Sequence, residues 1–224
     1  MPDRKELLEE FKTVFSGNTA VLDSVLPAFI FLLANALLGF SAAMWTALGC
    51  GAAITLARAL RGQKLWYALG GIGAALLAIG LRLLLNTSEA FFLPTIVNGG
   101  LTTMALLVSI LIKRPAVAFT SHLTRRWPLD WYWHPRVRPA YAEVTAAWVV
   151  FFAVKLLAQI ILYNRGDVDG LALFNLASGW PAMILLLVFS YVYGLKRLRA
   201  LEGPSIEEFN HNAPPPWQGQ TRGF

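Results

Sequence analysis

Long apolar stretches are the feature that most constrains the fold of this chain. A helix that crosses the hydrocarbon core of a bilayer needs about 20 predominantly apolar residues. The sequence contains six such stretches, at residues 21–40, 42–60, 65–85, 92–112, 144–163 and 171–194. They are long and continuous, whereas a membrane β-strand would show about ten residues of alternating polarity. The sequence therefore predicts an all-α, polytopic membrane protein built as a bundle of six transmembrane helices.

Composition favours the same class. Of the 224 residues, 56% are hydrophobic and 14% are charged, whereas soluble domains carry about 45–50% apolar and about 25% charged residues. A single cysteine, Cys50, excludes an intramolecular disulfide and a cysteine-based metal cluster. All three histidines lie outside the expected spans, and no Ser-His-Asp set or phosphate-binding glycine loop is present. We expect a protein that is not an enzyme and has no cofactor and no metal site.

The basic residues predict the orientation of the chain. Sixteen of the nineteen Lys and Arg lie in the N-terminal segment, the second and fourth connections and the C-terminal tail. Because segments rich in Lys and Arg stay on the cytoplasmic side, we expect both termini inside the cell. This requires an even number of spans, in agreement with six. The net charge of +6 then reflects topology and contact with anionic lipid headgroups, so no nucleic-acid partner is expected.

The segments that flank the spans have patterns of their own. Residues 1–18 read as an amphipathic helix, with apolar residues at helical spacing. This helix lies flat on the membrane surface or packs on the cytoplasmic loops of the protein itself. Residues 19–200 form the membrane domain. The polar, proline-rich tail, residues 201–224, is predicted to be disordered in the cytoplasm.

The cytoplasmic loop at residues 113–143 interleaves aromatic and basic side chains. Such a pattern occurs in proteins that bind single-stranded nucleic acid. Beside a membrane it indicates an interfacial belt, in which rings lie at headgroup level and cations contact phosphates. We interpret the loop as a lipid interface made by Trp127, Trp131, Trp133, Arg125, Arg126 and Arg136.

Polar side chains within the spans are candidate functional groups, because their burial in hydrocarbon is costly. Lys155 and Gln159 lie four residues apart and therefore share a helical face. One interpretation is a polar pathway; the other is that Lys155 extends along apolar surface to the outer headgroups. The candidate intramembrane polar site comprises Asp23, Asn35, Asn98, Lys155, Gln159 and Asn175.

Several motifs resemble those of the bacterial intracellular septation protein A family. Residues 23–27, Asp-Ser-Val-Leu-Pro, resemble its Asp-Phe-Leu-Pro opening. Residues 92–96, Phe-Leu-Pro-Thr-Ile, running into residues 107–115, resemble its central signature. Residues 148–152 and the Leu-Tyr pair at 162–163 resemble its aromatic fifth span. The similarity extends over roughly residues 20–200 and is closer still to a sister family of actinobacterial membrane proteins of unknown function.

The resemblance implies a protein of the bacterial plasma (inner) membrane, linked to upkeep of the cell envelope, to division and to the elongation machinery. No catalytic residues are carried over from the family. We therefore expect a non-enzymatic scaffold or an accessory subunit of a membrane complex, with another membrane protein or a second copy as its partner. The alternative is a small-solute or ion transporter with a polar site around Lys155.

Overall fold

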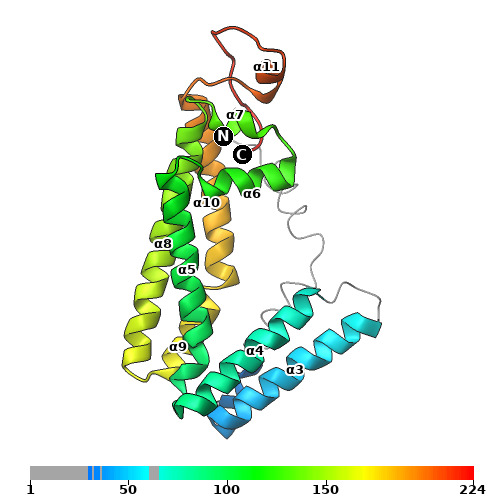
Figure 1. The fold of residues 1–224 in the computed structure, drawn as a ribbon, viewed down its shortest axis with the longest axis vertical. Coiled ribbons are helices and arrows are strands. Elements are labelled where there is room, and N and C mark those ends of the chain that lie inside the picture. The colour runs from blue at the N-terminus through cyan, green and yellow to red at the C-terminus, as the bar shows by residue number, and fades with distance from the viewer. Residues whose placement is uncertain (1–29, 32, 36, 61–65) are drawn as a thin grey trace. The chain divides into compact units, whose positions relative to one another are not determined.

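The structure, a computed structural model, describes residues 30–31, 33–35, 37–60 and 66–224. Within these ranges every regular element is a helix and no strand occurs (Figure 1), so the prediction of an all-α fold is confirmed for the described part. The amphipathic helix expected at residues 1–18 lies outside the described residues. So does most of the first expected span, residues 21–40.

The helices follow the apolar stretches closely. Three predicted spans, at residues 42–60, 65–85 and 92–112, correspond to α3, α4 and α5. The elements are α3 (Phe40–Leu60), α4 (Trp66–Leu85), the short 3₁₀ helix η1 (Glu89–Phe92), α5 (Leu93–Leu111), α6 (Ala116–Arg125), α7 (Leu129–Trp133), α8 (Arg138–Asn164), α9 (Val168–Ala177), α10 (Trp180–Ala200) and α11 (Ile206–Asn210).

Four helical stretches among the described residues are long and apolar enough to cross a membrane. They are Phe40–Ala57, Glu89–Leu111, Arg138–Asn164 and Val168–Ala200, and a shorter apolar helix covers Ala75–Leu85. The described residues thus show four candidate spans, and six crossings stay a prediction.

The sixth expected span, residues 171–194, is not one continuous helix. Helix α9 ends at Ala177 and α10 begins at Trp180. Pro181 has no N–H to donate to the carbonyl of Ala177, so the hydrogen-bond ladder is interrupted there. A Cβ at Gly179 would lie 3.0 Å from the carbonyl oxygen of Asn175, so a side chain there would crowd the end of α9. The sixth expected span therefore consists of two helices in sequence.

The contacts divide the chain into two compact units. The first consists of Met1–Val97 and Ala158–Pro181, and the second of Asn98–Leu157 and Ala182–Phe224. In the first unit α3 packs on α4, and η1 packs on α4 and α9.

Aromatic rings hold the end of the first unit together. The rings of Phe31 and Phe91 are stacked with centres 5.7 Å apart, and Phe40 and Phe92 pack against them edge-on. The guanidinium of Arg82 lies 5.8 Å from the centre of the Phe40 ring. Such aromatic pairs add about 0.5–1.5 kcal/mol each beyond their buried area, so they fix η1 against Phe31 and the start of α3.

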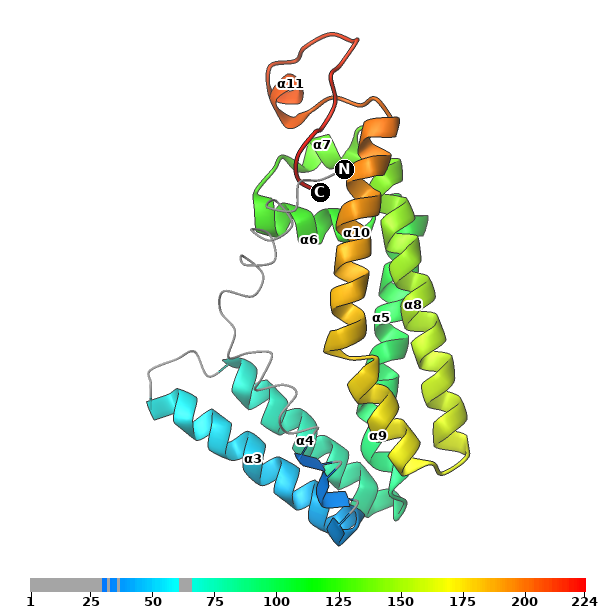
Figure 2. The ribbon, with the colours of Figure 1, turned by 180° about the vertical axis from the view of Figure 1, so that it is seen from behind.

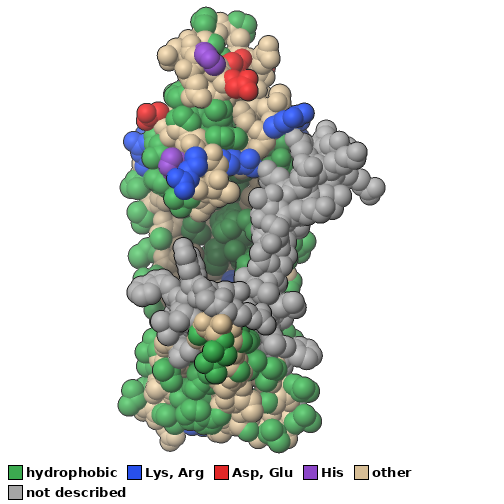
Figure 3. Space-filling model, turned by 90° about the vertical axis from the view of Figure 1, so that its right-hand side faces the viewer, with side chains coloured by type: hydrophobic (Ala, Val, Ile, Leu, Met, Phe, Trp, Pro, Cys, Tyr) green, Lys and Arg blue, Asp and Glu red, His purple; other side chains and the backbone are tan. Residues whose placement is uncertain are grey.

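In the second unit α5, α8 and α10 run side by side, and α6 and α7 lie across one end of them in both Figure 1 and Figure 2. The indole Nε1 of Trp148 on α8 donates to Ser190 Oγ on α10 at 2.8 Å. On the face shown in Figure 3, most charged side chains of this unit gather over α6, α7 and the C-terminal segment. The shafts of its helices present hydrophobic side chains, as a bilayer requires.

The end of the chain packs on this second unit. The ring of Phe224 stacks on that of Tyr141, with centres 4.3 Å apart and planes within 8°. It also lies over Gly194, where a Cβ would overlap the ring. Gly194 therefore creates the space that Phe224 fills.

We predict that Gly194→Ala displaces the ring of Phe224, because the added methyl group overpacks the site. The free energy with which the end of the chain packs on the second unit should fall by about 1–3 kcal/mol. Hydrogen exchange at residues 221–223 should rise. The matched control is Gly100→Ala on α5, whose Cβ would meet Leu156 at an ordinary 3.9 Å. Equal exchange in the two variants would contradict the packing seen here.

Candidate functional site

The loop and the tail fold together at one end of the second unit. We call this assembly, residues 115–144 and 194–224, the cap. Its centre is fully enclosed, with large aromatic side chains that have almost no exposed surface. The buried members of this cluster are Ala118, Trp131, Tyr132, Val137, Ala140, Tyr141 and Leu198. Partly buried side chains from the tail, Ile206, Phe209 and Phe224, pack around them.

Prolines and a left-handed residue set the path of the loop. Pro115 and Pro128 are the N-cap residues of α6 and α7, where a missing N–H costs no helical hydrogen bond. Arg126 ends α6 with a φ of 60°, and its N–H donates to the carbonyl of His122 at 2.8 Å. The ring Nδ1 of His122 also lies 2.6 Å from the Trp127 carbonyl oxygen. The loop is therefore held in two short helices.

Two polar bonds join the buried rings to distant parts of the chain. The indole Nε1 of Trp131 donates to the Pro204 carbonyl at 2.8 Å, and so links α7 to the tail. The hydroxyl of Tyr132 donates to Ser121 Oγ on α6 at 3.1 Å. Burial raises the pKa of Tyr132, so its hydroxyl stays protonated and keeps donating. The polar ends of Trp131 and Tyr132 thus both have hydrogen-bond partners, as buried Trp and Tyr side chains usually do.

The tail is ordered by side-chain contacts along its length. Sequence analysis predicts a disordered tail at residues 201–224, yet the structure places α11 within it and packs it on the cap. Ser205 and Glu208 form a reciprocal capping box at the start of α11. The Glu208 carboxylate further accepts from the backbone N–H of Gln218 at 2.7 Å and of Gly219 at 3.3 Å. Near the end, Arg125 Nε donates to the Phe224 carbonyl at 3.1 Å.

The outer face of the cap combines an aromatic ring, an imidazole and a guanidinium. The ring centres of His134 and Trp217 lie 5.3 Å apart, nearly perpendicular. The Arg136 guanidinium lies 5.6 Å from the centre of the Trp217 ring. Burial, and next the charge of Arg136, lower the pKa of His134, so the imidazole is neutral at pH 7. We call His134, Arg136 and Trp217 the outer triad.

A carboxylate within the cap joins the two long helices α8 and α10. Glu143 on α8 accepts from Arg197 Nε on α10 at 2.8 and 2.9 Å, and from the Tyr193 hydroxyl at 2.7 Å. Sequence analysis did not identify this cluster. The sequence spacing could have indicated it, because Tyr193 and Arg197 are four residues apart and therefore share one face of a helix.

The residues predicted for the lipid interface lie in different environments. Trp131 has no exposed surface, so the expectation that it contacts headgroups is corrected. Trp127 and Trp133 are half-buried, and Arg125 is half-buried beneath the tail. Arg126 and Arg136 are exposed.

Two of the intramembrane candidates meet in the first unit. Gln159 is completely buried on α8, and its Nε2 donates to Asn175 Oδ1 on α9 at 2.7 Å. Asn175 in turn donates from Nδ2 to the Leu171 carbonyl at 2.8 Å. The Gln159 Oε1 atom finds no hydrogen-bond partner within the described part of the chain. The pair lies one turn before the break between α9 and α10.

The other intramembrane candidates lie in different environments. Asn35 donates from Nδ2 to Asp169 Oδ1 in the first unit. Asn98 is exposed on α5, and Lys155 is half-buried on α8. Asp23 lies outside the described residues. Among the described residues, no three His, Cys, Asp or Glu side chains lie close enough together to hold a metal ion.

We predict that Glu208→Gln loosens the tail, because the neutral side chain accepts more weakly from the amides of Ser205, Gln218 and Gly219. Amide exchange at Gln218 and Gly219 should rise at neutral pH. Glu207→Gln, an exposed neighbour on the same helix, is the matched control.

The same carboxylate predicts a pH dependence. Backbone N–H groups of Ser205 and then Gln218 lower the pKa of Glu208 from 4.5 to about 2. Since the pKa is lowered on folding, the ionised form stabilises the docked tail above pH 4.5, and this stabilisation is lost as pH falls toward 2. Exchange at Gln218 that is unchanged across this range, after correction for intrinsic rates, would contradict the assignment.

We predict a coupling between Gln159 and Asn175. Gln159→Leu leaves the Asn175 oxygen without its donor, whereas the double variant with Asn175→Leu removes both groups. A double-mutant cycle of thermal unfolding in detergent should give about 0.6–2 kcal/mol, the range for hydrogen bonds between membrane helices. Strictly additive single effects would show that the bond contributes nothing.

Comparison with known proteins places the chain in a family. A family model described as "Protein of unknown function (DUF3159)" matches residues 15–200. No curated protein and no solved structure matches the chain. The match supports the expected similarity to a family of unknown function, and nothing in it links the chain to the septation protein A family. The chain therefore belongs to the DUF3159 family of proteins of unknown function.

Proposed function

We propose that the chain is a bacterial inner-membrane protein that crosses the bilayer six times and acts as a non-enzymatic scaffold or accessory subunit of a membrane complex. Four candidate spans and the shorter apolar helix at Ala75–Leu85 support the membrane location. The distribution of Lys and Arg supports a cytoplasmic position for both termini, the loop and the tail. A role near the septation or elongation machinery is the finer proposal, supported by the motif resemblance alone.

The cap is the observation that carries this proposal. Two segments on the proposed cytoplasmic side, distant in sequence, pack into one module with its own buried aromatic core. The module holds the outer triad in a fixed arrangement at its surface. Tryptophan and arginine are enriched at the energetic centres of protein interfaces, and a preordered surface loses less entropy on binding. The cap thus has the properties of a docking surface for a membrane-protein partner.

We predict that a photocrosslinker at Asn210, an exposed position at the end of α11, captures one discrete membrane protein in intact cells. Arg136→Ala with Trp217→Ala should abolish that product, because it removes the exposed guanidinium and the half-buried ring beside it. The same probe at Arg165, an exposed position between α8 and α9, is the control and should keep its own products. Products from Asn210 that are unaffected by the double variant would contradict the cap as a docking surface.

A second function, a small-solute or ion transporter, is favoured by one observation. The helix break at Gly179 lies next to the buried Gln159–Asn175 pair, and transporters place substrate sites at interrupted helices. Such a site must be open to water. In a Cys50→Ala background in proteoliposomes, Asn175→Cys should then react with a membrane-impermeant thiol reagent. Absence of reaction, while Glu207→Cys is labelled, would count against transport and leave the scaffold role standing.

A further inference from the structure

Helix α6 has one enclosed face and one exposed apolar face. Ala118 and Ser121 are buried inside the cap. On the opposite face the side chains of Phe119 and Leu123 are 41% and 72% exposed, with Thr120 and Thr124 exposed beside them. Because Phe119 and Leu123 are four residues apart, they form one apolar stripe along the helix.

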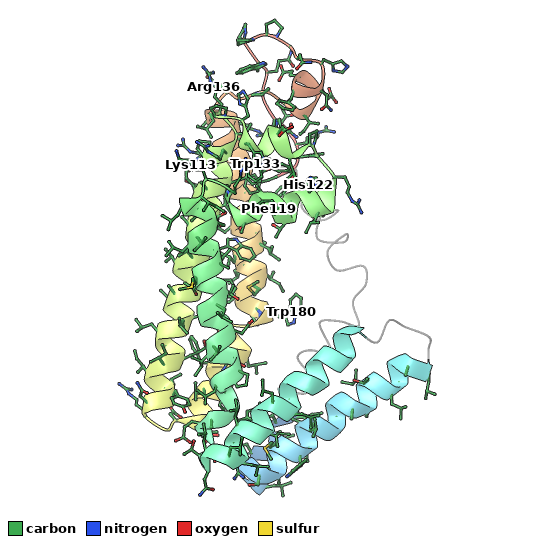
Figure 4. The ribbon with its side chains drawn as sticks, viewed as in Figure 1. Lys113, Phe119, His122, Trp133, Arg136 and Trp180 are labelled. Atoms are coloured by element: carbon green, nitrogen blue, oxygen red, sulfur yellow. The ribbon has the colours of Figure 1, made fainter. Side chains whose placement is uncertain are left out.

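Cations lie at both ends of this stripe. Lys113 and Arg114 precede α6 and are exposed, and Arg126 follows it and is exposed. The sequence contains no acidic residue between positions 113 and 126. The Arg114 guanidinium lies 4.4 Å from the centre of the Trp133 ring, whose centre is 5.2 Å from that of Phe119. In Figure 4, Lys113, Phe119 and Trp133 all lie at the end of the second unit that carries α6 and α7.

The stripe lies next to the end of a candidate membrane span. Only four residues separate Leu111, the last residue of α5, from Ala116, the first of α6. Ser109 on α5 fixes the junction, since its carbonyl accepts from Arg114 N–H at 2.9 Å and its hydroxyl from Ala116 N–H at 3.0 Å. In Figure 1 and Figure 2, α6 runs across the direction of α5. An apolar stripe at this position is at the level of the lipid headgroups.

We propose that α6 is a built-in binding surface for anionic phospholipid headgroups of the cytoplasmic leaflet. The proposal rests on the membrane topology given above. Phe119 and Leu123 enter the boundary between headgroups and acyl chains, while Lys113, Arg114 and Arg126 contact headgroup phosphates. The charge of the segment selects this occupant, because an uncharged lipid or an apolar protein groove would offer these three cations no anionic group.

The depth of α6 can be measured with a fluorescent probe. The full-length Cys50→Ala protein carries a single environment-sensitive label at Leu123→Cys, in bilayers of phosphatidylglycerol and phosphatidylcholine. Leu123 is exposed, so the substitution leaves the buried core of the cap intact. We expect blue-shifted emission and several times stronger quenching by shallow spin-labelled lipid than by deep spin-labelled lipid.

Two reference positions separate the failure of this proposal from the failure of the topology. Leu185 on α10 is 71% exposed within a candidate span and should be quenched by the deep label. Glu207 on α11 is exposed on the tail and should be quenched by neither. If Leu123→Cys behaves like Glu207→Cys while Leu185→Cys is quenched, α6 is not a lipid surface although the protein crosses the membrane. If Leu185→Cys is also unquenched, the topology itself fails.

The same probe tests whether the contact depends on the charge of the lipid headgroups. Lys113→Gln with Arg126→Gln should weaken the phosphatidylglycerol-dependent contact about fivefold per cation, which corresponds to the ~1 kcal/mol typical of a basic residue at an anionic surface. Lys196→Gln, an exposed cation on α10, is the matched control and should leave the Leu123 signal unchanged. A signal that is equally strong in pure phosphatidylcholine would overturn the assignment to anionic lipid.

Discussion

The structure depends on an excess of apolar surface that the protein cannot bury by itself. Large side chains such as Leu60 and Leu84 are 81% exposed, and many others along α5, α8 and α10 are 37–71% exposed. Water would penalise this surface by roughly 25 cal/mol per Å², whereas lipid accepts it. Lipid, however, offers no partner to backbone N–H and C=O groups, so the chain must satisfy them internally by forming helices. The all-helical architecture of the described residues follows from that constraint.

The cap differs from the apolar helices because it has a buried core of its own, as a soluble domain has. Its stability comes from rings that exclude water from both the loop and the tail, with Trp131 bonded to Pro204 and Tyr141 stacked on Phe224. Within the cap, Glu143 and Arg197 form an ion pair that joins α8 to α10. The same packing that orders the tail also orients α6 and holds the outer triad, so the two proposed surfaces of the cap share one core.

The sequence predicted the elements that depend on local composition. The predicted ends of the spans at residues 42–60 and 92–112 lie within two residues of the ends of α3 and α5, because apolar runs end where lipid contact ends. The fifth span was placed at 144–163, but α8 begins at Arg138, since its first turns pack in the cap instead of in lipid. Pro181 indicates an interruption of the sixth span, but the exact end of α9 at Ala177 could not be placed because apolarity continues through it. The order of the tail was missed because it rests on contacts, such as that of Arg125 with Phe224, between residues far apart in sequence.

For the candidate polar site, the sequence grouped Gln159 and Asn175 in one polar region, and the structure shows them hydrogen-bonded. The hydrogen bond from Asn35 to Asp169 could be found only from the fold.

The most direct test of this account is the sidedness of the chain in intact cells. In a Cys50→Ala background, single cysteines at Arg165, between α8 and α9, and at Gln218, on the cap, are treated with a membrane-impermeant maleimide. The account predicts that the cysteine at 165 is labelled at once and that the cysteine at 218 is labelled only after the membrane is permeabilised. Labelling of both positions in intact cells, or the reverse pattern, would contradict a membrane protein with its cap in the cytoplasm.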